Sequence, residues 1–172
     1  TYITKYYQLQ QESSLFNVLQ IALQKTIKLG KKWNWHTEIY VQQIIGAAPV
    51  HVPPLYTRNR IAYEGSLGFK NLDIAMGAEV RYRAPYKADG YSPVLGQFYY
   101  QDSITISNRL PDITGYVHFR IRSFKAFVRA ENLNTARVYD KQFGFTNNNF
   151  LLPNYTLPGL QIRIGIYWGF VN

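Results

Sequence analysis

The chain has 172 residues and no cysteine, so we expect one domain, residues 1–172, and exclude disulfides, thiolate metal sites and cysteine nucleophiles. Its formal net charge of +9 is spread over the predicted strands rather than clustered in a stripe, so we expect no nucleic-acid partner. No run approaches the roughly 20 apolar residues of a membrane-spanning helix, which excludes spanning by helices but not by strands.

Apolar and polar residues alternate with a period of two along much of the chain, which predicts β-strands because strand side chains point to opposite faces in turn. In chain order, the eight predicted strands cover residues 1–11, 15–29, 33–45, 57–69, 72–84, 112–122, 124–133 and 160–170. The first has no clear phase of alternation. The last has an uninterrupted apolar face, formed by Ile162, Ile164, Ile166, Trp168 and Phe170.

Two environments fit such strands. In a soluble sandwich or lipocalin-like barrel the apolar face points into a core, and in an outer-membrane barrel it points at lipid. The connections decide between them, because they are short near residues 31, 70 and 123 but long at 46–56, 85–111 and 134–158, with 12–14 as a short exception. Short periplasmic turns, long external loops and an even strand number are typical of outer-membrane barrels.

We therefore predict an all-β fold, an antiparallel transmembrane outer-membrane β-barrel with about eight strands in this chain. Trp33 and Trp35 lie on the apolar face beside the turn at 30–32, which favours an aromatic girdle at the membrane interface. Two tryptophans in a soluble core are the alternative. The predicted lipid-facing residues are those of the apolar face of the last strand.

Several short motifs follow one another from about residue 15 to the end. They are LYTRNRIAYE at 55–64, GAEVRY at 77–82, YSP at 91–93, GQFYYQ at 96–101, PD at 111–112, RAENL at 129–133 and PG at 158–159. Their order resembles the putative-porin family of Bacteroidota outer membranes. The resemblance implies the C-terminal portion of a larger barrel, and it implies no catalytic residues. ENL and LPG alone also resemble the last strands of TonB-dependent receptors, so the end of such a receptor-like barrel is an alternative.

The polar face is the candidate functional surface, with ten basic against five acidic side chains. The predicted pore-lining residues are Arg58, Arg60, Glu64, Glu79, Arg81, Arg83, His118, Arg120, Arg122, Arg129, Glu131 and Arg163. Arg58 and Arg60 of the strand at 57–69 should share one inner wall with Arg81 and Arg83 of the strand at 72–84. We expect Glu64 and Glu79 to lie deeper and to pair with some of these arginines. This composition fits either a water-filled pore that prefers anions or paired charges that brace a closed interior. The resemblance favours the pore, because it implies a wider barrel.

We therefore predict a porin-like protein in the outer membrane of a Gram-negative bacterium, which lets small hydrophilic solutes, including anions, diffuse passively. The rival hypothesis is a structural or assembly subunit of an outer-membrane complex. Outer-membrane lipid is an expected partner, as are the N-terminal part of the same barrel or other outer-membrane proteins. The chain starts at Thr1 without a signal region, so we expect a mature product or a piece of a longer protein. No residue spacing supports an enzyme, a cofactor or a metal site.

Overall fold

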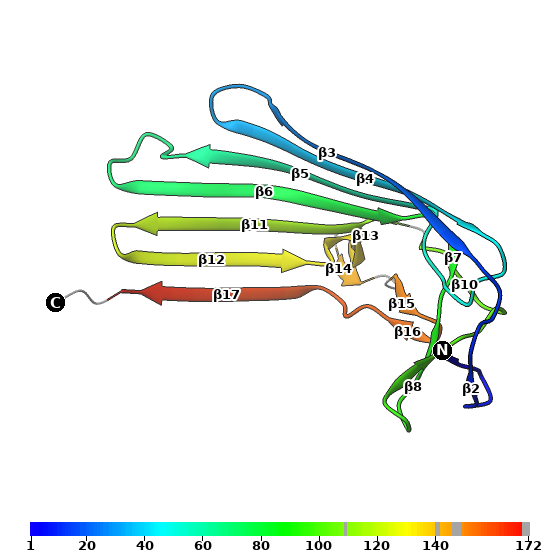
Figure 1. Ribbon diagram of the computed structural model, residues 1–172. Coiled ribbons are helices and arrows are strands. Elements are labelled where there is room, and N and C mark those ends of the chain that lie inside the picture. The colour runs from blue at the N-terminus through cyan, green and yellow to red at the C-terminus, as the bar shows by residue number, and fades with distance from the viewer. Residues whose placement is uncertain (109, 140–141, 146–148, 170–172) are drawn as a thin grey trace.

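One curved antiparallel sheet dominates the fold (Figure 1). The computed structural model describes residues 1–108, 110–139, 142–145 and 149–169. Its seven long strands lie in the order β17-β12-β11-β6-β5-β4-β3, so strands adjacent in the sheet follow one another along the chain. Their bounds are β3 Asn17–Lys28, β4 Trp33–Ile45, β5 Leu55–Gly65, β6 Leu72–Arg83, β11 Asp112–Ile121, β12 Phe124–Glu131 and β17 Gln161–Trp168.

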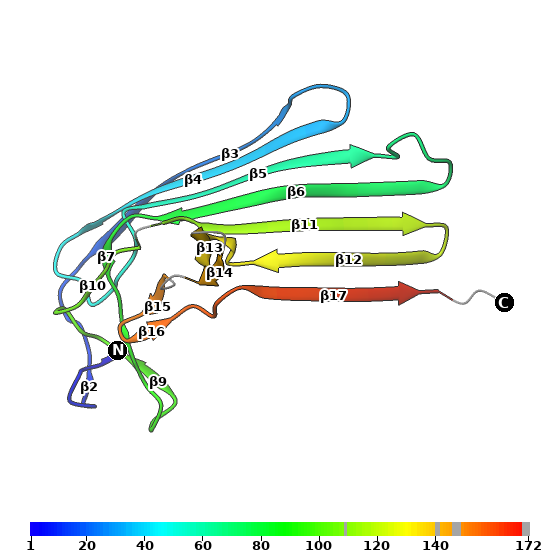
Figure 2. The ribbon, with the colours of Figure 1, turned by 180° about the vertical axis from the view of Figure 1, so that it is seen from behind.

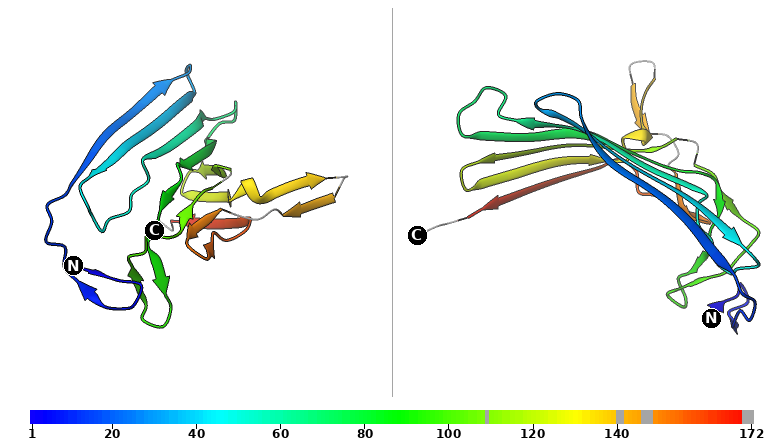
Figure 3. Two further views of the ribbon diagram at one scale, coloured as in Figure 1. Left: turned by 90° about the vertical axis from the view of Figure 1, so that its right-hand side faces the viewer. Right: turned by 45° about the horizontal axis from the view of Figure 1, so that its top comes forward.

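The sheet is open. Strands β3 and β17 are its two edge strands, and Figure 3 shows that they do not meet. The predicted antiparallel all-β architecture is confirmed, while the closed transmembrane barrel stays a prediction. Within the described residues, no helix is long and apolar enough to cross a bilayer.

Continuous antiparallel pairing separates the side chains into an apolar face and a polar face. Ile164 of β17 lies opposite Val128, and Ile21 of β3 lies opposite Val41, so apolar residues follow one another across the sheet. The apolar face is uncovered, since Ile162, Ile164 and Ile166 are 65%, 70% and 70% exposed. Among the described residues, only Ala62, Tyr63, Ala88 and Ile106 are buried hydrophobic residues. The sheet therefore has none of the apolar core that a soluble sandwich would need.

Short and long connections lie at opposite ends of the sheet, as predicted (Figure 2). The turn end holds the connections at 29–32, 66–71 and 122–123, and the long-connection end holds those at 46–54, 84–111 and 132–160. Positive φ angles make two of the turns tight: Gly30 has φ 141° and Arg122 has φ 53°.

The prediction of an eighth long strand at residues 1–11 is wrong. This segment forms only the hairpin β1 Tyr2–Ile3 and β2 Leu9–Gln10, which is separate from the seven-stranded sheet. A turn interrupts it, because the amide of Tyr7 donates to the carbonyl of Thr4 at 2.9 Å and Tyr7 has a left-handed φ of 62°. Seven is an odd number, so an even strand count gives no support to a barrel here.

Nine of the other fourteen strand boundaries differ from those predicted by one to four residues, and three of them bear on the argument. Strand β5 ends at Gly65 instead of residue 69, because Leu67 and Gly68 both have positive φ and the amide of Phe69 donates to the carbonyl of Ser66. Strand β11 ends at Ile121, which places Arg122 in the turn. Strand β17 ends at Trp168, and the predicted lipid-facing Phe170 lies outside the described residues.

The long connections contain their own short elements. These are β7 Tyr86–Lys87 paired with β10 Thr105–Ile106, β8 Gly90–Ser92 paired with β9 Gln97–Tyr99, the 3₁₀ helix η1 Leu133–Thr135, β13 Ala136–Tyr139 paired with β14 Gln142–Phe145, and β15 Phe150–Leu152 paired with β16 Tyr155–Thr156. The β13–β14 hairpin projects away from the others (Figure 3). Tyr91 contacts Tyr155 edge-on at 5.9 Å between ring centroids, so two of the long connections pack against each other.

Candidate functional site

The charged side chains of the polar face stand in rows across the strands. One row crosses the sheet near the long-connection end and is formed by Gln24, Glu38, Arg58, Arg81 and Asp112. The next row toward the turn end is formed by Thr26, His36, Arg60, Glu79 and Thr114. Each row draws one residue from each of five neighbouring strands, so the register of the sheet decides which charges meet.

Arg58 and Arg81 lie directly opposite each other in β5 and β6, an arrangement of like charges that destabilises a sheet unless it is compensated. Glu79 compensates it. Its Oε2 accepts a hydrogen bond of 2.7 Å from Nη2 of Arg58, and its Oε1 lies 3.2 Å from Nε of Arg81. Glu79 is only 6% exposed, so this carboxylate is enclosed by the two guanidinium groups.

A second acidic residue ties a long connection to the sheet. Asp112 accepts from Arg83 Nη2 at 3.3 Å through one oxygen and from Asn149 Nδ2 at 2.7 Å through the other. Asn149 Nδ2 also donates to the carbonyl of Leu110 at 2.7 Å. Asn149, the residue before β15, is thereby held against the first residue of β11.

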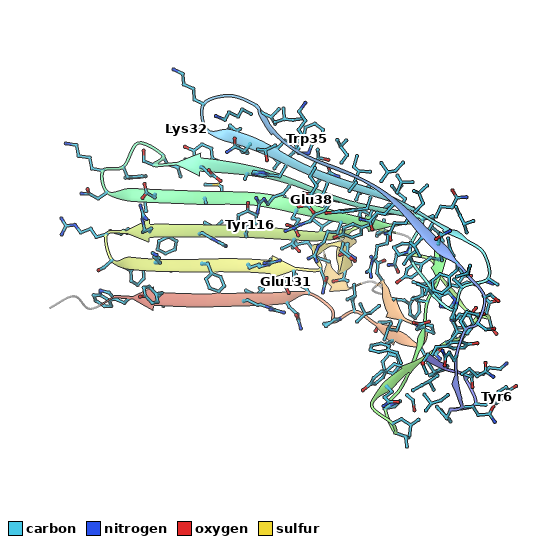
Figure 4. The ribbon with its side chains drawn as sticks, in the orientation of Figure 1. Tyr6, Lys32, Trp35, Glu38, Tyr116 and Glu131 are labelled. Atoms are coloured by element: carbon cyan, nitrogen blue, oxygen red, sulfur yellow. The ribbon has the colours of Figure 1, made fainter. Side chains whose placement is uncertain are left out.

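Glu131 is the third acidic centre. It lies on the same face as Glu38 but near the opposite edge of the sheet, in β12 beside β17 (Figure 4). Its two oxygens lie 2.9 Å from Arg129 Nε and 3.0 Å from Arg163 Nη2. At the turn end, Arg120 donates to Asp73 at 2.7 Å, and both side chains are more than half exposed. An exposed pair of this kind contributes little to stability.

The polar-face positions of the seven strands carry an excess of three positive charges with neutral histidines. The nine basic residues are Lys28, Arg58, Arg60, Arg81, Arg83, Arg120, Lys125, Arg129 and Arg163. The six acidic residues are Glu38, Glu64, Asp73, Glu79, Asp112 and Glu131. The predicted ten-to-five ratio changes because Lys70 and Arg122 lie in turns, whereas Lys125 and Asp112 join the polar face.

A cleft of about 390 Å³ opens on this face at the long-connection end, and we call it the mouth cleft. It is lined by Tyr56, Arg81, Arg83 and Arg129 from the sheet and by Leu151 and Leu157 from the last long connection, with Asp112, Glu131 and Asn132 beside them. A wider groove of about 760 Å³ lies toward the turn end, between Glu64, His118, Arg120 and Tyr167.

The structure brings together most of the predicted pore-lining residues on one face. Glu79 pairs with Arg58 and Arg81, as predicted, whereas Glu64 forms no ion pair with any described residue. Arg122 does not stand on the strand face, because it occupies the turn before β12. That these residues line a pore, and that Ile162, Ile164, Ile166 and Trp168 face lipid, stay predictions.

Sequence reasoning overlooked Asp112, Lys125 and Tyr56 as members of this face. The signal was available, because all three are in phase with assigned polar positions of their own strands, as Asp112 is with Thr114. The predicted polar face of this strand begins at Thr114 and therefore omits Asp112. Within the described ranges, no group of three or more His, Asp or Glu side chains could hold a metal ion.

Long antiparallel strands with one charged face and one exposed apolar face are the elements from which porin-like proteins are built. The chain belongs to the putative porin family, whose family model matches residues 1–172. No curated protein and no solved structure matches it. The predicted resemblance is thus confirmed as to family, and the match includes the first 14 residues, which the motifs did not reach.

Membership of this family supports a porin-like role in general terms, suggests a bacterial outer-membrane location and favours a protein without enzymatic activity. The restriction to Bacteroidota and the place of this chain in the C-terminal part of a larger barrel stay predictions.

Proposed function

We propose that this chain forms part of the wall of an outer-membrane β-barrel porin, through which small hydrophilic solutes diffuse passively with a modest preference for anions. One observation carries the proposal: the apolar face of the sheet is uncovered along its length, while the opposite face is charged and positive on balance. In a bilayer the first face would contact lipid and the second would line water.

Aromatic residues support the placement in a membrane. On the apolar face near the turn end, Trp33 packs edge-on against Tyr63 at 5.4 Å and Phe124 against Trp168 at 6.0 Å between ring centroids. Trp33 and Trp168 are 45% and 59% exposed, unlike core tryptophans. Aromatic side chains at this level are typical of the girdle at a membrane interface. The turn end would then lie at the periplasmic surface.

The open edges set a further requirement. Backbone groups along β3 and β17 would lack hydrogen-bond partners, which is not tolerated in contact with lipid. Further strands of the same polypeptide would close the barrel between these two edges. A closed ring of this kind is wider than seven strands alone and leaves room for water beside the arginine rows.

Ion selectivity tests this proposal. The full-length natural protein, reconstituted in a planar bilayer, should conduct and should show a reversal potential that favours anions at low salt. The double replacement Arg81→Glu and Arg83→Glu should shift that potential toward cations, because clustered charges at a mouth raise the local concentration of counter-ions. The shift should shrink at about 1 M salt, where the Debye length is only about 3 Å.

Replacing Lys31 and Lys70 with Glu provides the matched control. It changes the net charge by the same amount, but both residues lie in connections at the turn end. A protein that conducts with equal selectivity in all three forms would exclude Arg81 and Arg83 from the pore wall.

A structural or assembly subunit is the second candidate. It is favoured by the ion pairs, because five of the six acidic residues of the polar face are paired with arginines, as they would be in a braced interior. A correctly folded, reconstituted protein that passes no ions would support this function and contradict the porin.

A further inference from the structure

The mouth cleft has leucine side chains as well as arginines in its lining. Arg81, Arg83 and Arg129 reach it from the sheet, and Leu151 of β15 and Leu157, the residue after β16, reach it from the last long connection. Its volume of about 390 Å³ falls within the range of small-molecule sites in proteins, roughly 300–1,000 Å³.

The acidic groups beside the cleft are already engaged. Both oxygens of Asp112 accept hydrogen bonds, one from Arg83 and one from Asn149. Both oxygens of Glu131 lie in ion pairs with arginines. A ligand that enters the cleft therefore meets carboxylates whose charge is balanced by neighbouring side chains.

Two of the arginines turn the inner edge of the guanidinium group toward a carboxylate and keep the outer edge for a ligand. The buried Nε of Arg81 lies 3.2 Å from Glu79 and the buried Nε of Arg129 lies 2.9 Å from Glu131, so the two Nη groups of each are the donors that remain. No acceptor among the described residues takes a hydrogen bond from either guanidinium, and the two side chains are 37% and 39% exposed. Planar guanidinium groups with free N–H pairs bind carboxylates in a bidentate manner.

Hydrogen bonds at both ends hold the leucine-bearing wall of the cleft in place. At its start Asn149 is bonded to Asp112, and at its end Asn132 Nδ2 donates to the carbonyl of Pro158 at 2.8 Å. Between them, the amide of Leu157 donates to the carbonyl of Asn149 at 2.8 Å. The wall is thus positioned before any ligand arrives, which reduces the entropy lost on binding.

We infer that the mouth cleft is a binding subsite for small amphipathic carboxylates, which place the anionic group on Arg81 and Arg129 and the apolar part against Leu151 and Leu157. The inference rests on the proposed pore for its role, since such a subsite at the entrance would enrich these solutes over inorganic anions. The site itself requires only the folded chain.

Binding and conduction can be measured separately. Binding to the full-length natural protein in detergent is followed by saturation-transfer NMR with three probes: benzoate, which has both groups, inorganic phosphate, which has no apolar part, and benzyl alcohol, which has no charge. Phosphate lacks observable C–H protons and is therefore tested as a competitor of benzoate. We expect benzoate to bind, benzyl alcohol to give no specific signal and phosphate to compete weakly.

The variants assign the site. Arg81→Gln and Arg129→Gln should each weaken benzoate binding about tenfold or more, since a hydrogen bond to a charged group is worth at least a factor of this order. Arg81→Lys keeps the charge but not the bidentate geometry and should lose part of the binding. Leu151→Asn should weaken benzoate binding. Phosphate should therefore displace benzoate from this variant at a lower concentration than from the natural protein. Lys31→Gln, which removes a charge at the turn end, should leave all three probes unchanged.

Each outcome separates the two proposals. Benzoate binding that depends on Arg81 and Arg129 in a protein that conducts no ions would uphold the subsite and contradict the porin. Conduction without such binding would uphold the porin and overturn the subsite. Benzoate binding that is the same in Arg81→Gln, Arg129→Gln and the natural protein would also overturn it.

Discussion

Glu79 holds together the most crowded part of the polar face. Two arginines of neighbouring strands stand opposite each other, and this single carboxylate lies between their guanidinium groups with little access to water. Glu38 adds a weaker contact, 3.4 Å from Arg58. The positive wall of the proposed pore thus depends on one buried acid for its stability.

Glu79→Gln should lower the free energy of unfolding by about 1–3 kcal/mol, because the neutral amide leaves the facing arginines uncompensated. Glu64→Gln is the control, since Glu64 lies on the same face without an ion pair to a described residue, and it should change the free energy by about 0.5 kcal/mol or less. Urea unfolding of the full-length protein in lipid vesicles, followed by tryptophan fluorescence, measures both. Equal losses in the two variants would mean that Glu79 does not have this role.

The face of a strand on which a residue lies could be predicted from sequence, whereas its partner on the neighbouring strand could not. The faces of β6 and β17 follow from alternation, which depends only on residue parity along the strand. Partners across strands depend on register, which the turn determines. A tight turn at Lys70 and Asn71 would pair Arg58 with Arg83, but the longer connection at 66–71 pairs it with Arg81.

A shift of two residues leaves every side chain on its face but changes its neighbours. For this reason the four arginines predicted to lie together do share one face of the sheet, while the position of Glu79 between two of them required the structure. The prediction for residues 1–11 is wrong for a different reason. The alternation in this segment is too weak to show that a turn at Tyr7, which has a positive φ, divides it into two short strands.

The segregation of connections predicts which end of the strands faces the cell exterior. Because this chain has no cysteine, one that is introduced is the only cysteine within residues 1–172. Cysteine at Val94, 91% exposed in the β8–β9 connection, should react with a membrane-impermeant maleimide on intact cells. Cysteine at Lys31 should react only after the cells are opened. Labelling of Lys31→Cys but not Val94→Cys on intact cells would reverse the orientation.

One face of the seven-stranded sheet exposes large apolar side chains, whose contact with water is unfavourable. Isoleucines, leucines and aromatic residues cover one face, and no described segment of the chain packs over the length of it. Removing such side chains from water stabilises a protein by about 1.5–3 kcal/mol each. Seven strands of 8 to 13 residues match the roughly 9–11 residues with which a tilted strand crosses the hydrocarbon region. Family membership, uncovered face and strand length all agree with a sheet that lies in a membrane.

A spin-label scan of β17 in lipid bilayers tests this most directly. Each residue from Gln161 to Trp168 is replaced in turn by a labelled cysteine in the full-length protein, except Gly165, where a Cβ would lie 2.2 Å from the ring of Phe127. Collisions with oxygen, which concentrates in lipid, should peak at residues 162, 164, 166 and 168. Collisions with a water-soluble nickel complex should peak at 161, 163 and 167. A scan without this period of two, or with the opposite phase, would contradict the account of the sheet as a membrane-spanning wall.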